Sequence, residues 1–129
     1  MSQILLDTHT WVWSLMSEDQ LSPKAIQAIT TSDAVFVSPI SFFEIGQKVR
    51  LGKWPEMEAM APELPALLTQ QGGLVAALSP DICLHASLRE WDHRDPFDRF
   101  LASTAEILGL DLISKDAVFD QIDGVNRVW

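Results

Sequence analysis

Scarcity of cysteine, of basic residues and of long apolar runs excludes several classes of protein. Cys83 is the only cysteine, so no disulfide can form within the chain. Residues 1–7 lack the basic flank and long apolar core of a signal peptide, and no apolar run approaches the roughly 20 residues that span a bilayer. With 9 Lys and Arg against 18 Asp and Glu, the formal charge of −9 excludes the broad basic surface of a duplex-binding module. We therefore expect a cytoplasmic protein with no membrane association.

The rest of the composition is that of one folded unit. Of the 129 residues, 47% are hydrophobic and 21% are charged, which provides a core and is ordinary for a soluble globule. No repeat, low-complexity tract or linker divides the chain. We expect residues 1–129 to form a single domain that binds any polyanion locally or through a cation.

Short apolar runs alternate with helical segments along the chain. The predicted strands are residues 3–7, 34–38, 74–78, 111–114 and 125–128. The predicted helices are one capped by Thr8, one over 24–31 after Ser22-Pro23, one over 42–51 opened by Ser41, one from 79 to about 91, and one over 97–108. Residues 54–71 contain three prolines and should form only short helical pieces. The alternation predicts an α/β fold, a mostly parallel sheet with helices on both faces.

Four acidic residues lie where the predicted strands end. Asp7 closes the first strand, and Glu44 lies on the first turns of the helix after the second. Asp98 begins the helix before the fourth strand, and Asp116 lies just beyond that strand. Ligands of open α/β sheets bind at the carboxyl ends of strands, and carboxylates gathered there repel one another unless a divalent cation compensates them. Oxygen ligands suit Mg²⁺ or Mn²⁺, ions that promote phosphodiester hydrolysis by activating water.

Four segments resemble PIN-domain nucleases, most closely the VapC-type toxins of bacterial type II toxin–antitoxin systems. They are residues 4–9 (ILLDTH), 41–45 (SFFEI), 95–99 (DPFDR) and 112–116 (LISKD), in the family's order and spacing. The resemblance implies a three-layer α/β/α fold with a five-stranded parallel sheet, a Mg²⁺ or Mn²⁺ site and endoribonuclease activity on RNA. It also implies a homodimer and inhibition by a small DNA-binding antitoxin. The catalytic and metal-binding quartet that it implies is Asp7, Glu44, Asp98 and Asp116.

Each acid also has a structural interpretation. Asp7 could be a turn former or a helix cap, and Glu44 could complement the dipole of its helix. Asp116 could belong to an ordinary turn after the strand. Asp95 precedes Pro96, a pattern that predicts an N-cap, so we assign Asp98 to the metal and give Asp95 a supporting place behind it.

Several polar side chains flank the quartet. Thr8, His9 and Ser114 are candidates for contacts to substrate or to a ligand, with structural roles at a turn or helix start as the alternative. Arg99 is a candidate for neutralising phosphate, as are Arg94 and Lys115 at the same edge. Salt bridges to the nearby acids are the alternative for these cations.

Large apolar residues gather in two segments that are too apolar for exposed helices, and they are Trp11, Trp13, Trp54, Met57 and Met60. A place in the core is their default interpretation. The resemblance adds that the first helices and the region after the glutamate-bearing helix form the antitoxin groove and part of the homodimer interface, which would suit a helix-in-groove partner. A cationic antitoxin tail should be attracted to the acidic mouth, so its affinity should weaken as salt rises.

Two other functions are compatible with parts of this pattern. A phosphoacceptor receiver domain has a similar length and element order. It needs an acceptor aspartate at the end of a central strand, where this chain has residues 37–39 (VSP) and 78–80 (LSP) instead. A degenerate PIN-fold interaction protein would keep the fold without activity, and the four acids argue against it.

Overall fold

A parallel sheet of five strands lies in the middle of the described part of the chain, residues 2–129 of a computed structural model. The strands are β1 (Gln3–Leu6), β2 (Ala34–Val37), β3 (Leu74–Val75), β4 (Asp111–Ile113) and β5 (Arg127–Val128). Their order is β3-β2-β1-β4-β5, and all four pairings are parallel, which confirms the predicted sheet. Receiver domains have the order 2-1-3-4-5, so the topology excludes that alternative.

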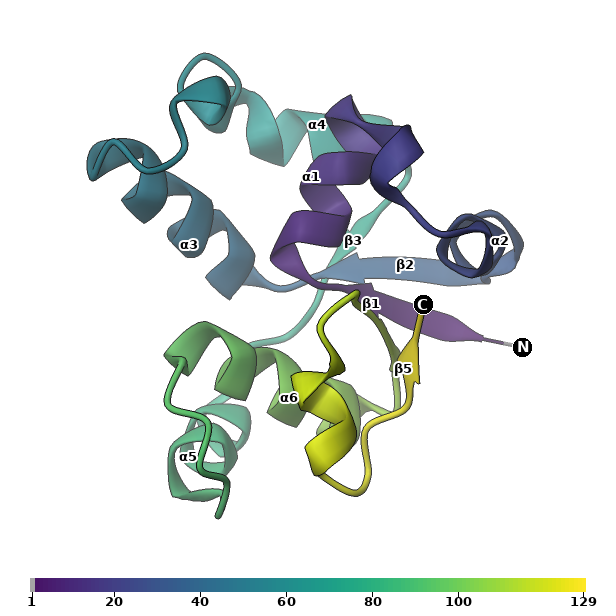
Figure 1. The fold of residues 1–129 in the computed structure, drawn as a ribbon, viewed down its shortest axis with the longest axis vertical. Coiled ribbons are helices and arrows are strands. Elements are labelled where there is room, and N and C mark those ends of the chain that lie inside the picture. The colour runs from purple at the N-terminus through teal and green to yellow at the C-terminus, as the bar shows by residue number, and fades with distance from the viewer. Residues whose placement is uncertain (1) are drawn as a thin grey trace.

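Helices cover both faces of the sheet and complete three α/β/α layers (Figure 1). One core lies between the sheet and α1 (Thr8–Met16), α2 (Pro23–Thr31), α3 (Pro39–Arg50) and α4 (Leu64–Gln70). On the other face α6 (Pro96–Leu108) packs on the sheet, and α5 (Pro80–Leu88) packs along α6. Among residues 2–129, no helix has the length and apolar character needed to cross a membrane.

Residues 4–6 of the central strand β1 contribute to both cores, which explains why these three residues are all apolar. Ile4 and Leu6 belong to the same core as Trp11 of α1, whereas Leu5 belongs to the core formed with α6. Ile4, Leu5 and Leu6 are almost completely buried, whereas Gln3 at the start of the strand is exposed. Since side chains alternate across a strand, a strand covered on both faces must be apolar at every position.

Two predicted helix starts are wrong by a few residues. Asp7, not Thr8, is the N-cap of α1, and its Oδ1 accepts a hydrogen bond of 2.7 Å from the backbone N–H of Thr10. Helix α3 begins at Pro39 with Ser38 as its N-cap, ahead of the predicted opening at Ser41. The predicted N-cap Ser22 followed by Pro23 is confirmed at the start of α2. Ser38-Pro39 has the same pattern of a cap residue followed by proline.

Three element lengths also differ from prediction, and the first is β5, which covers Arg127–Val128 rather than 125–128. Strand β3 ends at Val75 because its partner β2 turns into α3 just after Val37, and the last bond between them runs from Ala76 N–H to Val37 C=O. Helix α5 ends at Leu88 rather than near residue 91. The short helical pieces predicted over 54–71 are confirmed as the 3₁₀ turns Pro55–Met57 and Ala61–Glu63 and helix α4.

Candidate active site

Three of the four predicted acids line one cavity at the carboxyl edge of the sheet. Asp7 follows β1 directly, Asp116 lies three residues beyond the end of the adjacent β4, and Asp98 lies in the first turn of α6. The cavity has a volume of about 310 Å³. The rest of its lining consists of His9, Trp13 and Lys115.

Asp7 is held at the inner end of this cavity by donors from two elements. Burial raises the pKa of Asp7 above its ordinary value, while hydrogen bonds from Ser114 and Thr10, together with the nearby His9, partly oppose the shift. Its Oδ1 caps α1 through the Thr10 N–H. The fold therefore places a carboxylate where its charge costs free energy, and a cation bound beside it would offset that cost.

The negative charge of the Asp98 carboxylate is also unfavourable in its surroundings. Burial raises its pKa to about 6, repulsion from Asp95 and Asp116 adds to the rise, and His93 opposes it. His93 Nε2 lies 2.6 Å from Asp98 Oδ2. Proximity of three carboxylates thus favours protonation of one of them when no cation is bound.

Asp116 and Ser114 are joined at the end of β4. The buried Ser114 accepts a 3.1 Å hydrogen bond from the backbone N–H of Asp116 through its Oγ, and it also bonds the Asp7 carboxylate. Asp116 itself is exposed, and its Oδ1 caps the 3₁₀ turn Ala117–Gln121 by accepting from the Val118 N–H at 3.0 Å. Ser114 therefore connects two of the three acids.

Glu44 lies on α3 apart from the cavity lining. Its residue is only 7% exposed, and its Oε2 lies 2.9 Å from Lys48 Nζ, one helical turn along. The helix is anchored near the site, because Thr8 Oγ1 donates a 2.9 Å hydrogen bond to Ser41 Oγ, one turn before Glu44. Glu44 therefore lies on a helix beside the cavity. Its charge is compensated by Lys48, and its side chain is not part of the cavity lining.

Asp95 has the cap role predicted from its sequence. Its Oδ1 accepts hydrogen bonds from the backbone N–H groups of Phe97, at 2.8 Å, and Asp98, at 3.3 Å. This cap sets the start of α6 and so the position of Asp98. Asp95 therefore positions Asp98 indirectly, by capping the backbone at the start of the helix.

Arg99 points away from the acids and into the connector between α5 and α6. Its guanidinium donates to backbone carbonyl oxygens, and these belong to Ala86, Ser87, Arg89, Trp91 and His93. Neither alternative from the sequence, phosphate contact or a salt bridge to the acids, describes this geometry. Arg99 instead holds the connector that carries His93.

His93 is the contact that sequence reasoning missed. His93, Asp95 and Asp98 each offer a ligand atom, and these atoms all lie within 4.8 Å of one another. No local pattern places His93 against Asp98, because the path of the connector depends on Arg99, six residues further along the chain. The proximity of a histidine to the DPFDR segment was the one available signal.

The donor set of the cavity fits a divalent cation. Three carboxylates face a single lysine in its lining, and the pKa values of Asp7 and Asp98 are both raised by burial. Oxygen-rich sites of this kind suit Mg²⁺ or Mn²⁺.

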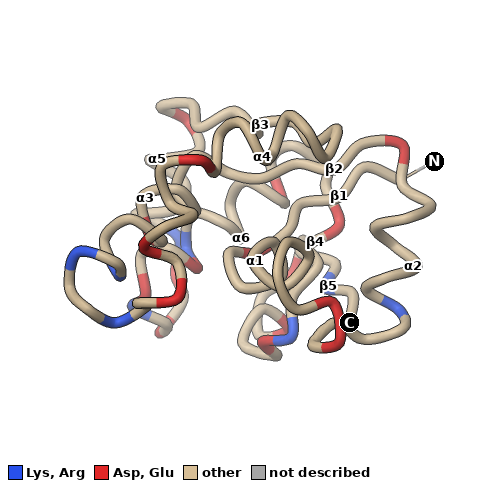
Figure 2. Tube along the Cα trace, turned by 90° about the horizontal axis from the view of Figure 1, so that it is seen from above, with Lys and Arg blue, Asp and Glu red and all other residues tan. Residues whose placement is uncertain are grey.

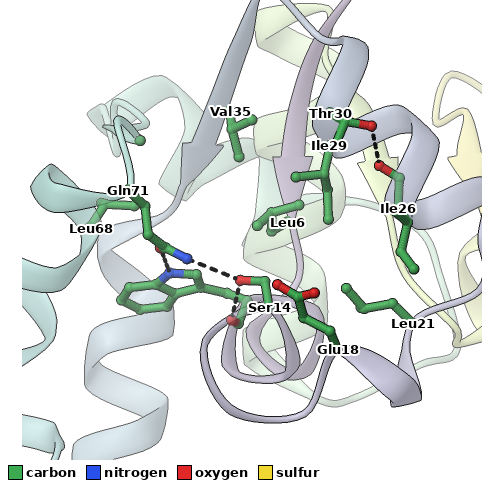
Figure 3. Close-up of a pocket in the computed structure, with 12 residues that line it drawn as sticks. Leu6, Ser14, Glu18, Leu21, Ile26, Ile29, Thr30, Val35, Leu68 and Gln71 are labelled. Atoms are coloured by element: carbon green, nitrogen blue, oxygen red, sulfur yellow. Dashed lines mark hydrogen bonds between the residues drawn. The ribbon is translucent and has the colours of Figure 1, made fainter.

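A second, more apolar cavity of about 240 Å³ lies on the α1, α2 and α4 side of the sheet (Figure 3). Its apolar lining includes Leu6, Val35, Ile29 and Leu68. A polar chain crosses one side, because Trp11 Nε1 donates to Gln71 Oε1 at 3.0 Å, and Gln71 Nε2 donates to Ser14 Oγ at 3.4 Å. Figure 3 shows Glu18 beside Ser14 at this cavity.

The three-layer fold and the acidic edge of its parallel sheet define a PIN-type α/β protein. The PIN domain family model matches residues 4–125. The chain therefore belongs to the PIN-domain family, which confirms the resemblance carried by its four motifs.

Known relatives give the same result. Ribonuclease VapC22 of Mycobacterium tuberculosis is 32% identical over 122 residues, which cover 90% of this chain and 88% of that protein. VapBC2 from Rickettsia felis, solved bound to a DNA fragment from its promoter, has a chain that matches with a TM-score of 0.69 at 14% identity. VapBC-1 from nontypeable Haemophilus influenzae matches with a TM-score of 0.69 at 18% identity. In both cases 97% of this chain and 96% of the other are covered, so the likeness establishes the fold.

Proposed function

We propose that this protein, folded as one PIN domain over residues 1–129, is a Mg²⁺- or Mn²⁺-dependent endoribonuclease that acts as the toxin of a toxin–antitoxin pair. The observation that carries the proposal is the convergence of Asp7, Asp98 and Asp116 on one cavity, in which burial raises the pKa of Asp7 and of Asp98. The 32% identity to a protein named as a ribonuclease supports RNA as the substrate.

Each polar residue of the cavity has a distinct task in this proposal. Asp7, Asp98 and Asp116 hold the cation, which when bound supplies activation of the attacking water and compensation of phosphate charge. Ser114 and the Thr10 N–H orient Asp7, so that its position does not depend on the ion. Lys115 offers a positive charge to the phosphate from the cavity wall.

Glu44 is proposed as the fourth acid of the site. In this structure its carboxylate contacts Lys48, which compensates its charge. Glu44 lies one turn from the Thr8–Ser41 hydrogen bond, and Thr8 is the neighbour of Asp7. For Glu44 to contribute to the site, its carboxylate would have to release Lys48 and bind the cation, or a water molecule on the cation, instead.

The proposed partners are an RNA substrate, an inhibitory antitoxin and a second copy of the chain. The solved structures named above are VapBC toxin–antitoxin assemblies, which supports an antitoxin partner. The apolar cavity between α1, α2 and α4 provides a surface for an amphipathic antitoxin segment. Exposed apolar residues on α5, with Leu84 at 59% and Leu88 at 75%, support a homodimer. A cytoplasmic location agrees with an RNA substrate.

Replacement of Asp7 tests the activity without removing the helix cap. Asp7→Asn keeps an oxygen that can accept from the Thr10 N–H but lacks the charge. We expect end-mapped cleavage of total cellular RNA in Mg²⁺ or Mn²⁺ to fall by more than about a hundredfold, the scale of losing a group that stabilises transition-state charge. Excess EDTA should abolish cleavage by the wild type.

Asp7→Ala is the matched structural control. It should lose the same activity and, in addition, about 1 kcal/mol of stability, because alanine cannot cap α1. Full cleavage in excess EDTA, or by Asp7→Asn, would contradict the proposed chemistry. A wild type that binds its antitoxin but cleaves no RNA would instead identify a degenerate interaction protein.

A further inference from the structure

Three aromatic side chains form a rim beside the acidic cavity, and we refer to His9, Trp13 and Trp54 as the aromatic rim. His9 and Trp13 line the cavity together with the acids. The His9 ring stacks on Trp54, with centroids 5.0 Å apart and planes 27° apart, and lies 5.8 Å from the ring of Trp13. The rim is therefore a continuous aromatic surface that borders the carboxylates.

The fold places this rim next to Asp7 for a simple geometric reason. Helix α1 begins immediately after Asp7, so His9 is its second residue and Trp13 follows one turn later on the same face. Trp54 follows α3 and packs against the core on one side. Lys48 Nζ, which is paired with Glu44, lies 5.4 Å from the centroid of the Trp54 ring.

Core packing explains only part of the rim. Trp11, on the opposite side of α1 from the cavity, is fully buried, as core packing requires. Trp13 and Trp54 are only half-buried, and His9 is exposed. His9 stacks on Trp54 and is tilted against Trp13, and the exposed parts of these rings leave an aromatic surface beside the acids on which another flat ring can stack.

We infer that the aromatic rim binds an unstacked nucleobase of single-stranded RNA next to the phosphate held at the acids. The inference rests on the proposed nuclease function. Stacking of a base on aromatic side chains tolerates any base, whereas bases within a duplex are paired and stacked on one another. The rim can therefore accept a base from a single-stranded segment or a loop, but not a base that is paired within a duplex.

The net charge of the chain strengthens this assignment. A protein with a formal charge of −9 cannot hold an RNA backbone with a long basic groove. Affinity must then come from a small number of local contacts, and base stacking is one that does not require positive charge. Lys115 supplies one local positive charge in the cavity lining.

Substitution of His9 separates ring stacking from imidazole chemistry. With an RNA oligonucleotide that spans a mapped cleavage site, His9→Ala should raise KM by about five- to fiftyfold and leave kcat nearly unchanged, because the lost contact serves binding. His9→Phe keeps a flat ring and should restore KM to within about threefold of wild type. Met16→Ala, an exposed position at the far end of α1, is the control and should behave as wild type.

Abasic substrates provide the second readout. Removal of one base beside the scissile phosphate should weaken cleavage by wild type and by His9→Phe, but should add little to the defect of His9→Ala. Equal KM values for His9→Ala and wild type would overturn the inference, as would equal defects in His9→Ala and His9→Phe. If His9→Ala cleaves RNA normally and escapes inhibition by its co-expressed antitoxin, the rim belongs to the protein partner instead. Absence of any cleavage that depends on Asp7 would refute the nuclease function itself.

Discussion

Asp7 and Asp116 each combine two roles, helix or turn cap and lining of the acidic cavity, that the sequence presented as alternatives. Asp7 uses Oδ1 to cap α1, and Asp116 uses Oδ1 to cap the turn after β4. Both residues also line the acidic cavity. Because a carboxylate has two oxygens, capping with one leaves the other for a cation or for water. The choice between helix cap and ligand is therefore not exclusive at either position.

Asp98 should make the stability of the metal-free protein depend on pH. Its pKa is about 6 in the folded protein and 3.8 when unperturbed, so between these values the folded state keeps a proton that the unfolded state has released. The free energy of unfolding should therefore fall as pH rises from about 4 to about 6. After a discount for partial exposure, we expect Asp98 to account for about 1 to 2 kcal/mol of this fall.

Urea unfolding in EDTA across this pH range measures the effect. Asp98→Asn cannot titrate, so its stability should change less over the same interval. The buried Asp7, whose pKa is raised as well, leaves a residual slope of the same sign in that variant. Superimposable pH profiles for wild type and Asp98→Asn would show that Asp98 has no raised pKa.

At the scale of elements, Arg99 decides where α5 ends and how the connector to α6 runs. The cap residue and proline at the start of each helix are local signals, and Ser22-Pro23, Ser79-Pro80 and Asp95-Pro96 were all recognised from the sequence. The end of α5 has no such signal. Its free carbonyls are satisfied by the Arg99 guanidinium, which comes from α6.

Arg99→Ala should destabilise the protein by about 2 to 4 kcal/mol, because it leaves several carbonyl oxygens without a charged donor. The free energy of unfolding at pH 7 measures the loss, and amide hydrogen exchange should increase over residues 89–95. Arg50→Ala, an exposed arginine at the end of α3, is the control and should change stability by less than about 0.5 kcal/mol. Equal unfolding midpoints for the two variants would refute this role of Arg99.

At the scale of the molecule, the excess of acidic residues should govern binding of partners. Figure 2 shows more acidic than basic positions along the folded trace, in keeping with the formal charge of −9. The acidic cavity adds a local negative potential at the sheet edge. A cationic antitoxin segment would be attracted to this field, and salt would screen the attraction.

We therefore expect affinity for the antitoxin to fall by at least about tenfold between low and high ionic strength. Titration of the purified pair at about 50 and 500 mM salt, where the Debye length shortens severalfold, measures it. An affinity independent of salt would show that the apolar cavity between α1, α2 and α4 holds the antitoxin without help from charge.

Local patterns in the sequence determined the order of strands and helices along the chain, the parallel sheet, the positions of Asp7 and Asp116 after strands, and those of Glu44 and Asp98 near helix starts. These follow from side-chain periodicity, capping residues and prolines, which act over a few neighbouring residues. The four family motifs were also readable, because each is a continuous segment.

Only the tertiary structure decided which groups meet across the fold. It brought Asp7, Asp98 and Asp116 to one cavity, paired Glu44 with Lys48, and directed Arg99 to carbonyls instead of acids. It also placed His93 against Asp98 and His9 against Trp54. These contacts depend on the paths of connectors and on packing between distant elements, so no local spacing along the chain specifies them.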